Sequence, residues 1–350
     1  MTNLEIFNAK TVDETLSWLS KQWKKRRYVD HFDPRTVDDA ISLLSQYQEE
    51  AKIIAGGVDL ISLMKSEVTL PKVLVSINAI PDMTYIKEDA EGLKIGPLTT
   101  IHDIEMSAII GDKYEILAEA AHSVAAPQIR NMATIGGNLC QSVRCWYYRR
   151  SPYTGRSFYC RRKGGEQCYS GTGENTYHAI IGAGECHAVC PSDMAPALIA
   201  LNAKVKITGQ HGNRIIPLEE FYQVMGNILE PGELIIEIQI PAPGTNARQK
   251  YLKFRTRKAI DFAIASVAAT LTLETGVVSD ARIVLGGVAP TPYRAIAAED
   301  ILKGEVVTRD VAEAAAEAAL AEAIPLDMNG YKVPITEALV KEVLNKTGLR

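Results

Sequence analysis

The stretch AKIIAGGVDLISLMK, residues 51–65, combines three features that together predict a fold and a binding site. Ile53 and Ile54 form a short apolar strand, Gly56 and Gly57 form a turn without Cβ atoms, and residues 59–65 have the pattern of a helix. Such a turn presents several backbone N–H groups at the start of a helix, where a phosphate group can approach closely. A single Gly-Gly turn is weak evidence, so a second one matters.

The second Gly-Gly turn occurs in VAAPQIRNMATIGGNLC, residues 124–140. Gly136 and Gly137 precede Asn138, whose side chain is able to hold a phosphate oxygen or to cap a helix. Two such turns predict a joint site for one pyrophosphate. Neither is the usual nicotinamide-binding fingerprint; the nearest approach, HAIIGAGECH at 178–187, has His187 at the third glycine position and no helical run after it.

Composition indicates an ordinary globular chain. The 350 residues are 47% hydrophobic and 23% charged with a net charge of −4, which predicts two or three domains with buried cores. The near-neutral balance argues against nucleic-acid binding, and no apolar run approaches the roughly 20 residues that a membrane span needs.

The first residues predict a helical extension over 1–27. FNAKTVDETLSWLS from Phe7 resembles FDPRTVDDAISLLS from Phe32, and each predicts an amphipathic helix capped by threonine. The basic cluster at 24–27 is followed by Asp30 rather than by an apolar region, so we expect a solvated helix end and not a twin-arginine signal. We therefore expect a cytoplasmic protein, or a periplasmic one if a partner carries the export signal.

All six cysteines lie in one segment, residues 139–190, which we call the cysteine segment. No Cys-x-x-Cys pair is present, so a zinc ribbon fits poorly, and disulfides are disfavoured in a chain that we do not expect to be secreted. Four thiolates around an iron–sulfur cluster tolerate irregular spacing because they come from a wrapped loop. The pattern favours such a cluster.

The polar residues of the cysteine segment leave two questions open. His178 and His187 are candidate metal ligands, although histidines in a loop more often form hydrogen bonds. Between Arg144 and Cys168 the sequence contains seven basic residues and one acidic residue, Glu166. The basic residues either offset the charge of an anionic cluster or form a docking patch for an acidic electron carrier. These are Arg144, Arg149, Arg150, Arg156, Arg161, Arg162 and Lys163.

Five motifs in order resemble one known family. They are IIAGGVDLISLMK, QIRNMATIGGNL, PSDMAPALIALNA, KFRTRKAIDFAIASVAA and VLGGVAPTPYRA. Over about residues 28–345 the chain is similar to the FAD-binding medium subunit of the molybdenum hydroxylases, the xanthine oxidase family. The resemblance implies an α+β fold: a two-lobed FAD-binding domain of the vanillyl-alcohol-oxidase/PCMH type over 28–242, then a smaller α+β domain over 243–350.

The resemblance also implies a set of FAD-binding residues. Asp193 would hold the ribityl or flavin end and Lys253 would lie near the isoalloxazine. The family usually has Thr where this chain has Val58, so the grip on phosphate must come from backbone N–H groups. The residues implied for the pyrophosphate are Lys52, Ile53, Ile54, Ala55, Gly56, Gly57, Val58, Asp59, Leu60, Thr134, Gly137 and Asn138.

The cysteine segment corresponds to an insertion over about residues 140–191. It is similar to the insertion of 4-hydroxybenzoyl-CoA reductase and of a bacterial aldehyde oxidoreductase, in both of which it binds a [4Fe–4S] cluster. The resemblance implies Cys145, Cys160, Cys168 and Cys186 as ligands. Cys190, which precedes Pro191, is the best substitute for Cys186.

The function implied is that of an oxidoreductase subunit without catalytic residues of its own. Its partners would be a molybdopterin-binding large subunit and a [2Fe–2S] small subunit, in a heterotrimer or a dimer of heterotrimers. It would pass electrons between these subunits and an external one-electron carrier such as ferredoxin. Activities like those of hydroxybenzoyl-CoA reductase or aldehyde oxidoreductase are candidates for the complex. The alternatives are a xanthine or heterocycle dehydrogenase subunit that uses NAD, a stand-alone flavin oxidase, and a zinc module that lost its flavin. The oxidase usually carries a histidine near the first Gly-rich loop, and none lies near Gly56.

The rest of the chain predicts a sheet with helices on one face. Strands are expected at 233–241, 265–273 and 281–288, the last two joined near Gly276, and helices at 310–324 and 335–344.

Overall fold

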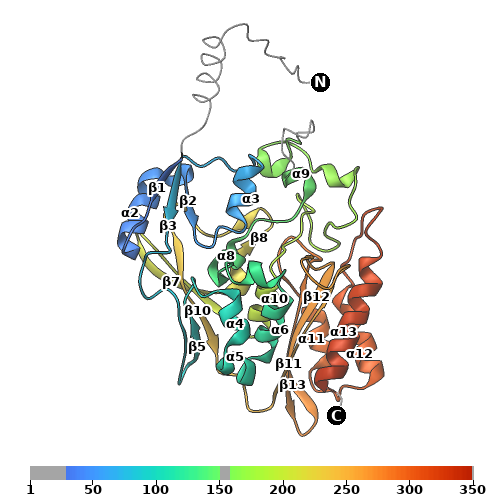
Figure 1. Ribbon diagram of the computed structural model, residues 1–350. Helices are drawn as coiled ribbons and strands as arrows, with labels where there is room; N and C mark the ends of the chain where they lie inside the picture. The colour runs from blue at the N-terminus through green and yellow to red at the C-terminus, as the bar shows by residue number, and fades with distance from the viewer. Residues whose placement is uncertain (1–28, 150–157, 349–350) are drawn as a thin grey trace, which may run out of the picture.

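The structure, a computed structural model, describes residues 29–149 and 158–348. The predicted extension at 1–27 and its basic cluster lie outside the described residues, as do Arg150 and Arg156. The three larger sheets and their helices can be followed in Figure 1, and the cysteine segment lies at one end of the molecule. Within the described ranges, no helix combines the length and the apolar character that crossing a bilayer requires.

The first lobe is built on a three-stranded parallel sheet of order β1-β3-β2. Its elements are β1 (Asp30–Phe32), α2 (Val37–Tyr47), β2 (Ala51–Ile54), α3 (Leu60–Lys65) and β3 (Val73–Ser76). Thr36 caps α2 by accepting a hydrogen bond from the Asp39 N–H at 3.1 Å, and Ile41 and Leu44 are buried. The threonine-capped amphipathic helix and the strand, turn and helix at 51–65 are therefore confirmed.

The second lobe holds an antiparallel sheet of order β4-β5-β10-β6-β7. Its strands are β4 (Ile86–Asp89), β5 (Gly92–Ile95), β6 (Lys204–Gly209), β7 (Gly212–Pro217) and β10 (Leu234–Pro241). The strand expected at 233–241 exists, but it pairs with β5 and β6 and not with the later strands. The reason is packing, because Ile238 and Ile240 of β10 are buried in the core of this lobe.

Helices cover this sheet and lead to the cleft. They are α4 (Ile101–Met106), α5 (Ala108–Lys113), α6 (Glu115–Ser123), α7 (Pro127–Arg130), α8 (Ile135–Cys140) and α10 (Met194–Ala200). The short helix α9 (Trp146–Arg149) belongs to the cysteine segment, and β8 (Tyr222–Gln223) pairs with β9 (Gly226–Asn227) in a small hairpin. A capping box between Thr100 and Asp103 starts α4.

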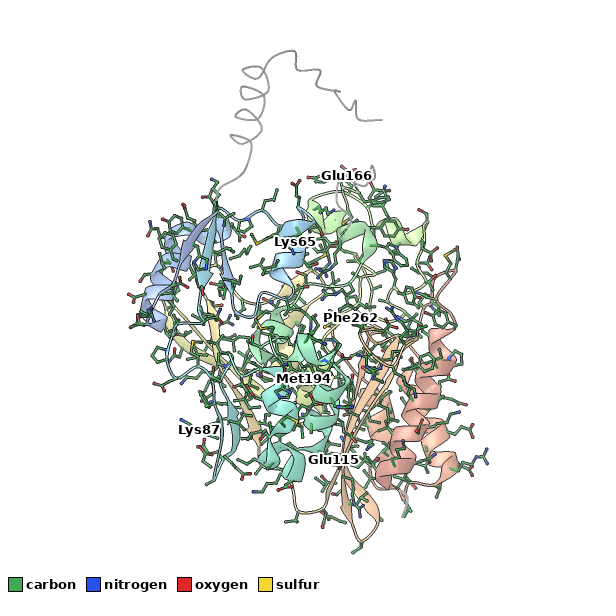
Figure 2. The ribbon with its side chains drawn as sticks, viewed as in Figure 1. Lys65, Lys87, Glu115, Glu166, Met194 and Phe262 are labelled. Carbon is green, nitrogen blue, oxygen red and sulfur yellow. The ribbon has the colours of Figure 1, made fainter. Side chains whose placement is uncertain are left out.

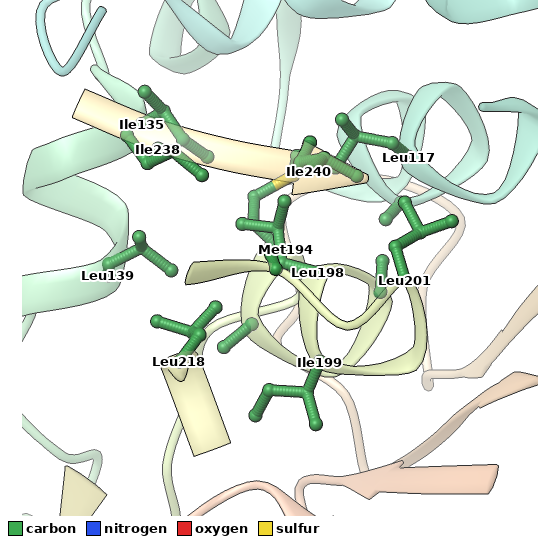
Figure 3. Packing of buried hydrophobic residues seen from close by; sticks show 14 of the residues in the cluster. Leu117, Ile135, Leu139, Met194, Leu198, Ile199, Leu201, Leu218, Ile238 and Ile240 are labelled. Atoms are coloured by element: carbon green, nitrogen blue, oxygen red, sulfur yellow. The ribbon is translucent and has the colours of Figure 1, made fainter. Parts of the chain in front are cut away.

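Helix α10 is the centre of the main core. All of its residues are buried, and Figure 3 shows Met194 and Leu198 packed near Ile240 of β10. A buried leucine or methionine contributes about 1.5–3 kcal/mol relative to an exposed one, so this helix is held firmly in place. Because Asp193 immediately precedes α10, core packing also fixes the position of Asp193.

The C-terminal part is an antiparallel sheet of order β11-β12-β13-β14. Its elements are β11 (Ala247–Phe254), β12 (Ala265–Glu274), β13 (Val277–Gly286), β14 (Tyr293–Arg294), α11 (Ile296–Leu302), α12 (Arg309–Ala319) and α13 (Lys332–Gly348). Helices α11 and α13 pack on this sheet and α12 packs against both of them, while α6 and α10 join the sheet to the second lobe (Figure 1). Gly276, at a φ of 91°, turns the chain between β12 and β13 as expected. The predicted α+β fold is confirmed, as are the strands at 265–273 and 281–288 and both helices.

Candidate functional site

A cleft of about 560 Å³ opens between the first lobe, the second lobe and the loop at 260–262. The segment 51–60 forms one wall, and the start of α8 and Asp193 form the other. The predicted cofactor residues that line it are Lys52, Ile53, Ile54, Ala55, Gly56, Gly57, Val58, Asp59, Leu60, Thr134, Gly137, Asn138 and Asp193.

The first Gly-Gly turn, residues 55–59, presents backbone donors to this cleft. The N–H groups of Gly56, Gly57, Val58 and Asp59 donate to no other residue in the described part of the chain. A Cβ on Gly56 would lie 1.8 Å from the carbonyl oxygen of Met132, so glycine is required there for the two walls to meet. Unpaired N–H groups at the surface of a cleft suit an anion such as phosphate.

The second Gly-Gly turn is different, and the expectation of a second cradle of free N–H groups was wrong. Gly136 and Gly137 lie inside α8, and Thr134 caps that helix by accepting from the Gly137 N–H at 3.2 Å. The Gly136 N–H donates to Pro97 at 2.9 Å, and the Asn138 N–H donates to Thr134 at 2.8 Å. Backbone donors are therefore already used here, which leaves the side chains of Thr134 and Asn138 as the polar groups of this wall. Ser192 donates to the Asn138 side-chain oxygen at 2.6 Å and fixes its orientation.

Asp193 and Lys253 form a buried ion pair. Lys253 Nζ lies 2.7 Å from Asp193 Oδ2, and the two side chains are only 3% and 5% exposed. The Tyr251 hydroxyl donates to the other carboxylate oxygen at 2.8 Å, and burial followed by the charge of Asp193 raises the pKa of Tyr251 well above its ordinary value. Asp193 lines the cleft, whereas Lys253 lies behind it and joins β11 to the second lobe. Sequence patterns gave no sign of Tyr251.

Asp59 connects the first Gly-Gly turn to the cysteine segment. Its carboxylate accepts from the Ser142 N–H at 2.8 Å and lies 2.8 Å from Arg149 Nη2 and 2.9 Å from Arg144 Nη1. The Arg144 guanidinium also stacks on the Phe262 ring, 4.4 Å from its centroid. Burial lowers the pKa of Arg144 to about 10, and Asp59 opposes that shift. Two arginines and a backbone N–H thus tie the cysteine segment to the cleft.

Phe262 stands where the cleft meets a second pocket. That pocket has a volume of about 460 Å³ and lies between the cysteine segment and the loop at 256–264. Phe262 and Arg144 line both cavities. In Figure 2, Phe262 lies between Glu166 of the cysteine segment and Met194 of α10.

These contacts correct the interpretation of the basic residues as one exposed docking patch. Arg144 and Arg149 are turned inward to Asp59, and Arg162 Nε lies 3.1 Å from Cys186 Sγ. Arg161 is exposed and pairs with Glu185 at 3.1 Å. The charges are used to hold the segment together because buried carboxylate, thiol and carbonyl groups need donors.

Two residues at the cleft have unusual backbone geometry. Ala125 has a φ of 41° and Ile260 a φ of 71°, and the Ile260 N–H donates to the Ala125 carbonyl at 2.9 Å. Both residues line the cleft. Positive φ is rare for a β-branched residue and is maintained only where surrounding structure enforces it.

Four cysteines of the cysteine segment are connected by pairwise interactions of their thiols, Cys145 with Cys160 and Cys168, and Cys168 with Cys186. Cys186 and Cys168 are hydrogen-bonded, which lowers the pKa of Cys168 and raises that of Cys186. Burial raises the pKa of Cys145, and the nearby thiols of Cys168 and Cys160 raise it further. The four are the cysteines that the resemblance implies as ligands. All six cysteines of the chain are free thiols, so the structure contains no disulfide.

Cys190 and Cys140 have other surroundings. Burial raises the pKa of Cys190 to about 11, and its thiol faces Asp193 and Arg144 near the cleft. Both cysteines also lie near the buried Tyr222 hydroxyl. Of the two candidates for the fourth position, Cys186 is the one whose thiol interacts with that of Cys168.

Within residues 29–149 and 158–348, no three His, Cys, Asp or Glu side chains converge to hold a single metal ion. In a [4Fe–4S] cluster each thiolate binds a different iron, so its four sulfurs do not converge on one point. The ligand set therefore stays a prediction. His178 Nε2 lies 3.3 Å from Cys145 Sγ, and burial lowers the pKa of His178 to about 4.

Two family models match most of the chain. The one described as the FAD binding domain in molybdopterin dehydrogenase matches residues 26–243. The one described as the CO dehydrogenase flavoprotein C-terminal domain matches residues 250–347.

Curated relatives match over nearly their full length. The carbon monoxide dehydrogenase medium chain of Hydrogenophaga pseudoflava is 30% identical over 327 residues, which cover 92% of this chain and 97% of that protein. The aldehyde oxidoreductase FAD-binding subunit PaoB of Escherichia coli K12 is 34% identical over 311 residues, with 87% and 93% covered. A solved structure of carbon monoxide dehydrogenase from Hydrogenophaga pseudoflava superposes with a TM-score of 0.74 at 29% identity, covering 91% of this chain and 97% of that one.

Proposed function

The chain belongs to the FAD-binding medium subunits of the molybdenum hydroxylase family, and on that premise we propose that it carries electrons between FAD and a [4Fe–4S] cluster held by its cysteine segment. The observation that carries the proposal is the set of contacts that the Asp59 carboxylate makes. This carboxylate belongs to the turn that faces the cleft, and it holds the cysteine segment through Ser142, Arg144 and Arg149. One side chain thus sets the distance between the two proposed redox sites.

The residues that would hold FAD fit its chemistry. The free N–H groups of the first Gly-Gly turn would receive the pyrophosphate, and the Thr134 and Asn138 side chains would complete the site from the opposite wall. Asp193 would hold the ribityl or flavin end, with Lys253 supporting it from behind. FAD, when bound, accepts electrons in pairs and releases them singly.

Cys145, Cys160, Cys168 and Cys186 would hold the cluster. Their proximity supports this set over one that includes Cys190. Arg162 at Cys186 supplies positive charge beside thiolates, which suits an anionic centre. A cluster in this position would accept and return single electrons.

The complex would contain further subunits. We propose that a molybdopterin-binding large subunit and a [2Fe–2S] small subunit assemble with this chain, as a heterotrimer or a dimer of heterotrimers. An external one-electron carrier such as a ferredoxin would exchange electrons with the complex. With Arg144, Arg149 and Arg162 turned inward, charge steering of that carrier would depend on Arg161 among the described arginines of the cysteine segment. The named relatives act on different substrates, so we propose none for the complex.

A reductive titration of the anaerobically purified chain tests the proposal. The wild-type chain should take up about three electrons, two at FAD and one at the cluster. Cys160→Ser should take up about two and keep its full flavin content. Uptake of two electrons by the wild type, with no iron bound, would reject the cluster while leaving the flavin assignment intact.

A further inference from the structure

The imidazole of His178 is buried against Cys145. His178 is 2% exposed, and its Nε2 lies 3.3 Å from Cys145 Sγ. The Trp146 and Tyr147 rings pack on it with centroid distances of 5.6 Å and 5.9 Å. The other ring nitrogen, Nδ1, is buried and has no hydrogen-bond partner among the described residues.

The backbone of His178 is fixed by the C-terminal domain. Its carbonyl oxygen accepts from Lys332 Nζ at 3.0 Å and from Asn329 Nδ2 at 3.2 Å. Lys332 and Asn329 are both 0% exposed. The Asn329 amide also donates to the Ala179 carbonyl at 3.2 Å, so the backbone that carries the imidazole is held from a part of the chain that lies outside the cysteine segment.

This geometry decides which nitrogen carries the proton. A neutral imidazole has one N–H, and a buried N–H without an acceptor costs free energy. With the proton on Nε2, the N–H points to the Cys145 sulfur and the unpaired Nδ1 is only an acceptor. With the proton on Nδ1, a donor would be buried without a partner.

We infer that His178 is a positioning residue that donates a hydrogen bond from Nε2 to the Cys145 thiolate and raises the reduction potential of the cluster. The inference rests on the proposed function. Reduction adds negative charge to a cluster and its sulfurs, and a fixed donor stabilises that charge more than it stabilises the oxidised form. When the cluster takes one electron from an external reductant, the proton stays on Nε2.

Three substitutions at His178 distinguish the effect of the hydrogen-bond donor from the effect of the imidazole ring. In His178→Gln, the amide nitrogen reaches the position of Nε2 and keeps the hydrogen bond. In His178→Asn, the amide nitrogen reaches only the position of Nδ1, and His178→Leu offers no donor.

A dithionite titration followed by EPR gives the ratio of reduced to oxidised cluster at the wild-type midpoint potential. The Asn and Leu variants lose the extra stabilisation that the donor gives to the reduced cluster, so the ratio should fall severalfold in both of them. It should stay near the wild-type value in the Gln variant. Iron and FAD contents should be the same in all four proteins.

Equal ratios in wild type, Asn and Leu variants with full iron content would overturn the inference and leave the proposed function standing. Absence of iron from the wild type would instead reject the proposed function. Loss of iron in the Gln, Asn and Leu variants alike would show that His178 is a ligand, which also overturns the inference.

A measurement that keeps His178 itself decides the case if the variants fail to fold. His187 contacts Cys168, another proposed ligand, so its nitrogen signal has to be removed. The measurement therefore uses the His187→Gln variant labelled with nitrogen-15 histidine. Pulsed EPR should find the weak nitrogen coupling of a hydrogen bond to the cluster. A coupling as strong as that of a bound nitrogen, or none, would contradict the inference.

Discussion

The Asp59 carboxylate lies 2.8 Å from the Arg149 guanidinium, although the two residues are 90 positions apart in sequence. Asp59 belongs to the turn at the cleft and Arg149 ends α9 of the cysteine segment. The same carboxylate oxygen lies 2.9 Å from Arg144. Any change that loosens this contact therefore acts on both proposed redox sites.

Asp59→Asn should weaken the attachment of the cysteine segment. The amide carries one oxygen in place of two and no charge, so the ion pairs with Arg144 and Arg149 are lost, and removal of one partner of a largely buried pair costs up to about 3–5 kcal/mol. Trypsin should cut the cysteine segment faster, and the melting temperature should fall. Asp89→Asn removes a surface carboxylate that lies 2.7 Å from Lys94 and should change neither readout measurably. Equal proteolysis rates in both variants would contradict the proposed link.

Gly56→Ala should abolish tight FAD binding. The added Cβ would lie 1.8 Å from the Met132 carbonyl oxygen, so the turn must move away from the opposite wall of the cleft. Gly111→Ala is the matched control, because a Cβ at that helical position meets nothing within 4 Å. Flavin absorbance per chain after gel filtration measures the difference. Full flavin retention by Gly56→Ala would show that the first Gly-Gly turn does not hold FAD.

Lys253→Met should destabilise the protein by about 3–5 kcal/mol, because it leaves the Asp193 carboxylate buried without its cation. Adding Asp193→Asn should recover a large part of this loss, since an amide still accepts from Tyr251 without an unpaired charge. Urea unfolding of the two single variants and the double variant gives the coupling free energy. Additive losses would mean that the pair contributes little.

The burial of the Lys332 side chain should make the free energy of unfolding depend on pH. Burial lowers its pKa from 10.5 to about 7 in the folded protein. Between these two pH values the unfolded chain binds a proton that the folded chain does not. The free energy of unfolding should therefore increase as pH rises from about 7 to 10.5, and below pH 7 this group should not affect its pH dependence. The free energy of unfolding of wild type minus that of Lys332→Met should rise across the window. A constant difference would show that the carbonyls of His178 and Gly287 keep the ammonium charged.

Local patterns gave the elements, whereas contacts between distant segments were not accessible from sequence. Ile53, Ile54 and Gly57 predict a strand and a turn because each residue type restricts its own backbone. The same reasoning failed at Gly137, since whether its N–H is free depends on the Thr134 side chain and on the packing of the segment against Pro97.

Charge patterns had the same limit. Arg144 and Arg149 could be counted in the sequence, but the direction in which their side chains point depends on Asp59, a residue of another lobe. The choice between Cys186 and Cys190 was likewise left open, because a spacing of four residues does not tell which thiol faces Cys168. Strained positions such as Ile260 have no sequence signal, since isoleucine normally avoids that conformation.

The most direct test of the account is the iron content of two serine variants purified anaerobically. Cys186→Ser should lower iron and acid-labile sulfide toward zero, because the Cys186 thiol interacts with that of Cys168, another proposed ligand. Cys190→Ser should keep about four irons per chain and bound FAD. Four irons in Cys186→Ser with loss only in Cys190→Ser, or stoichiometric zinc in place of iron, would contradict the account.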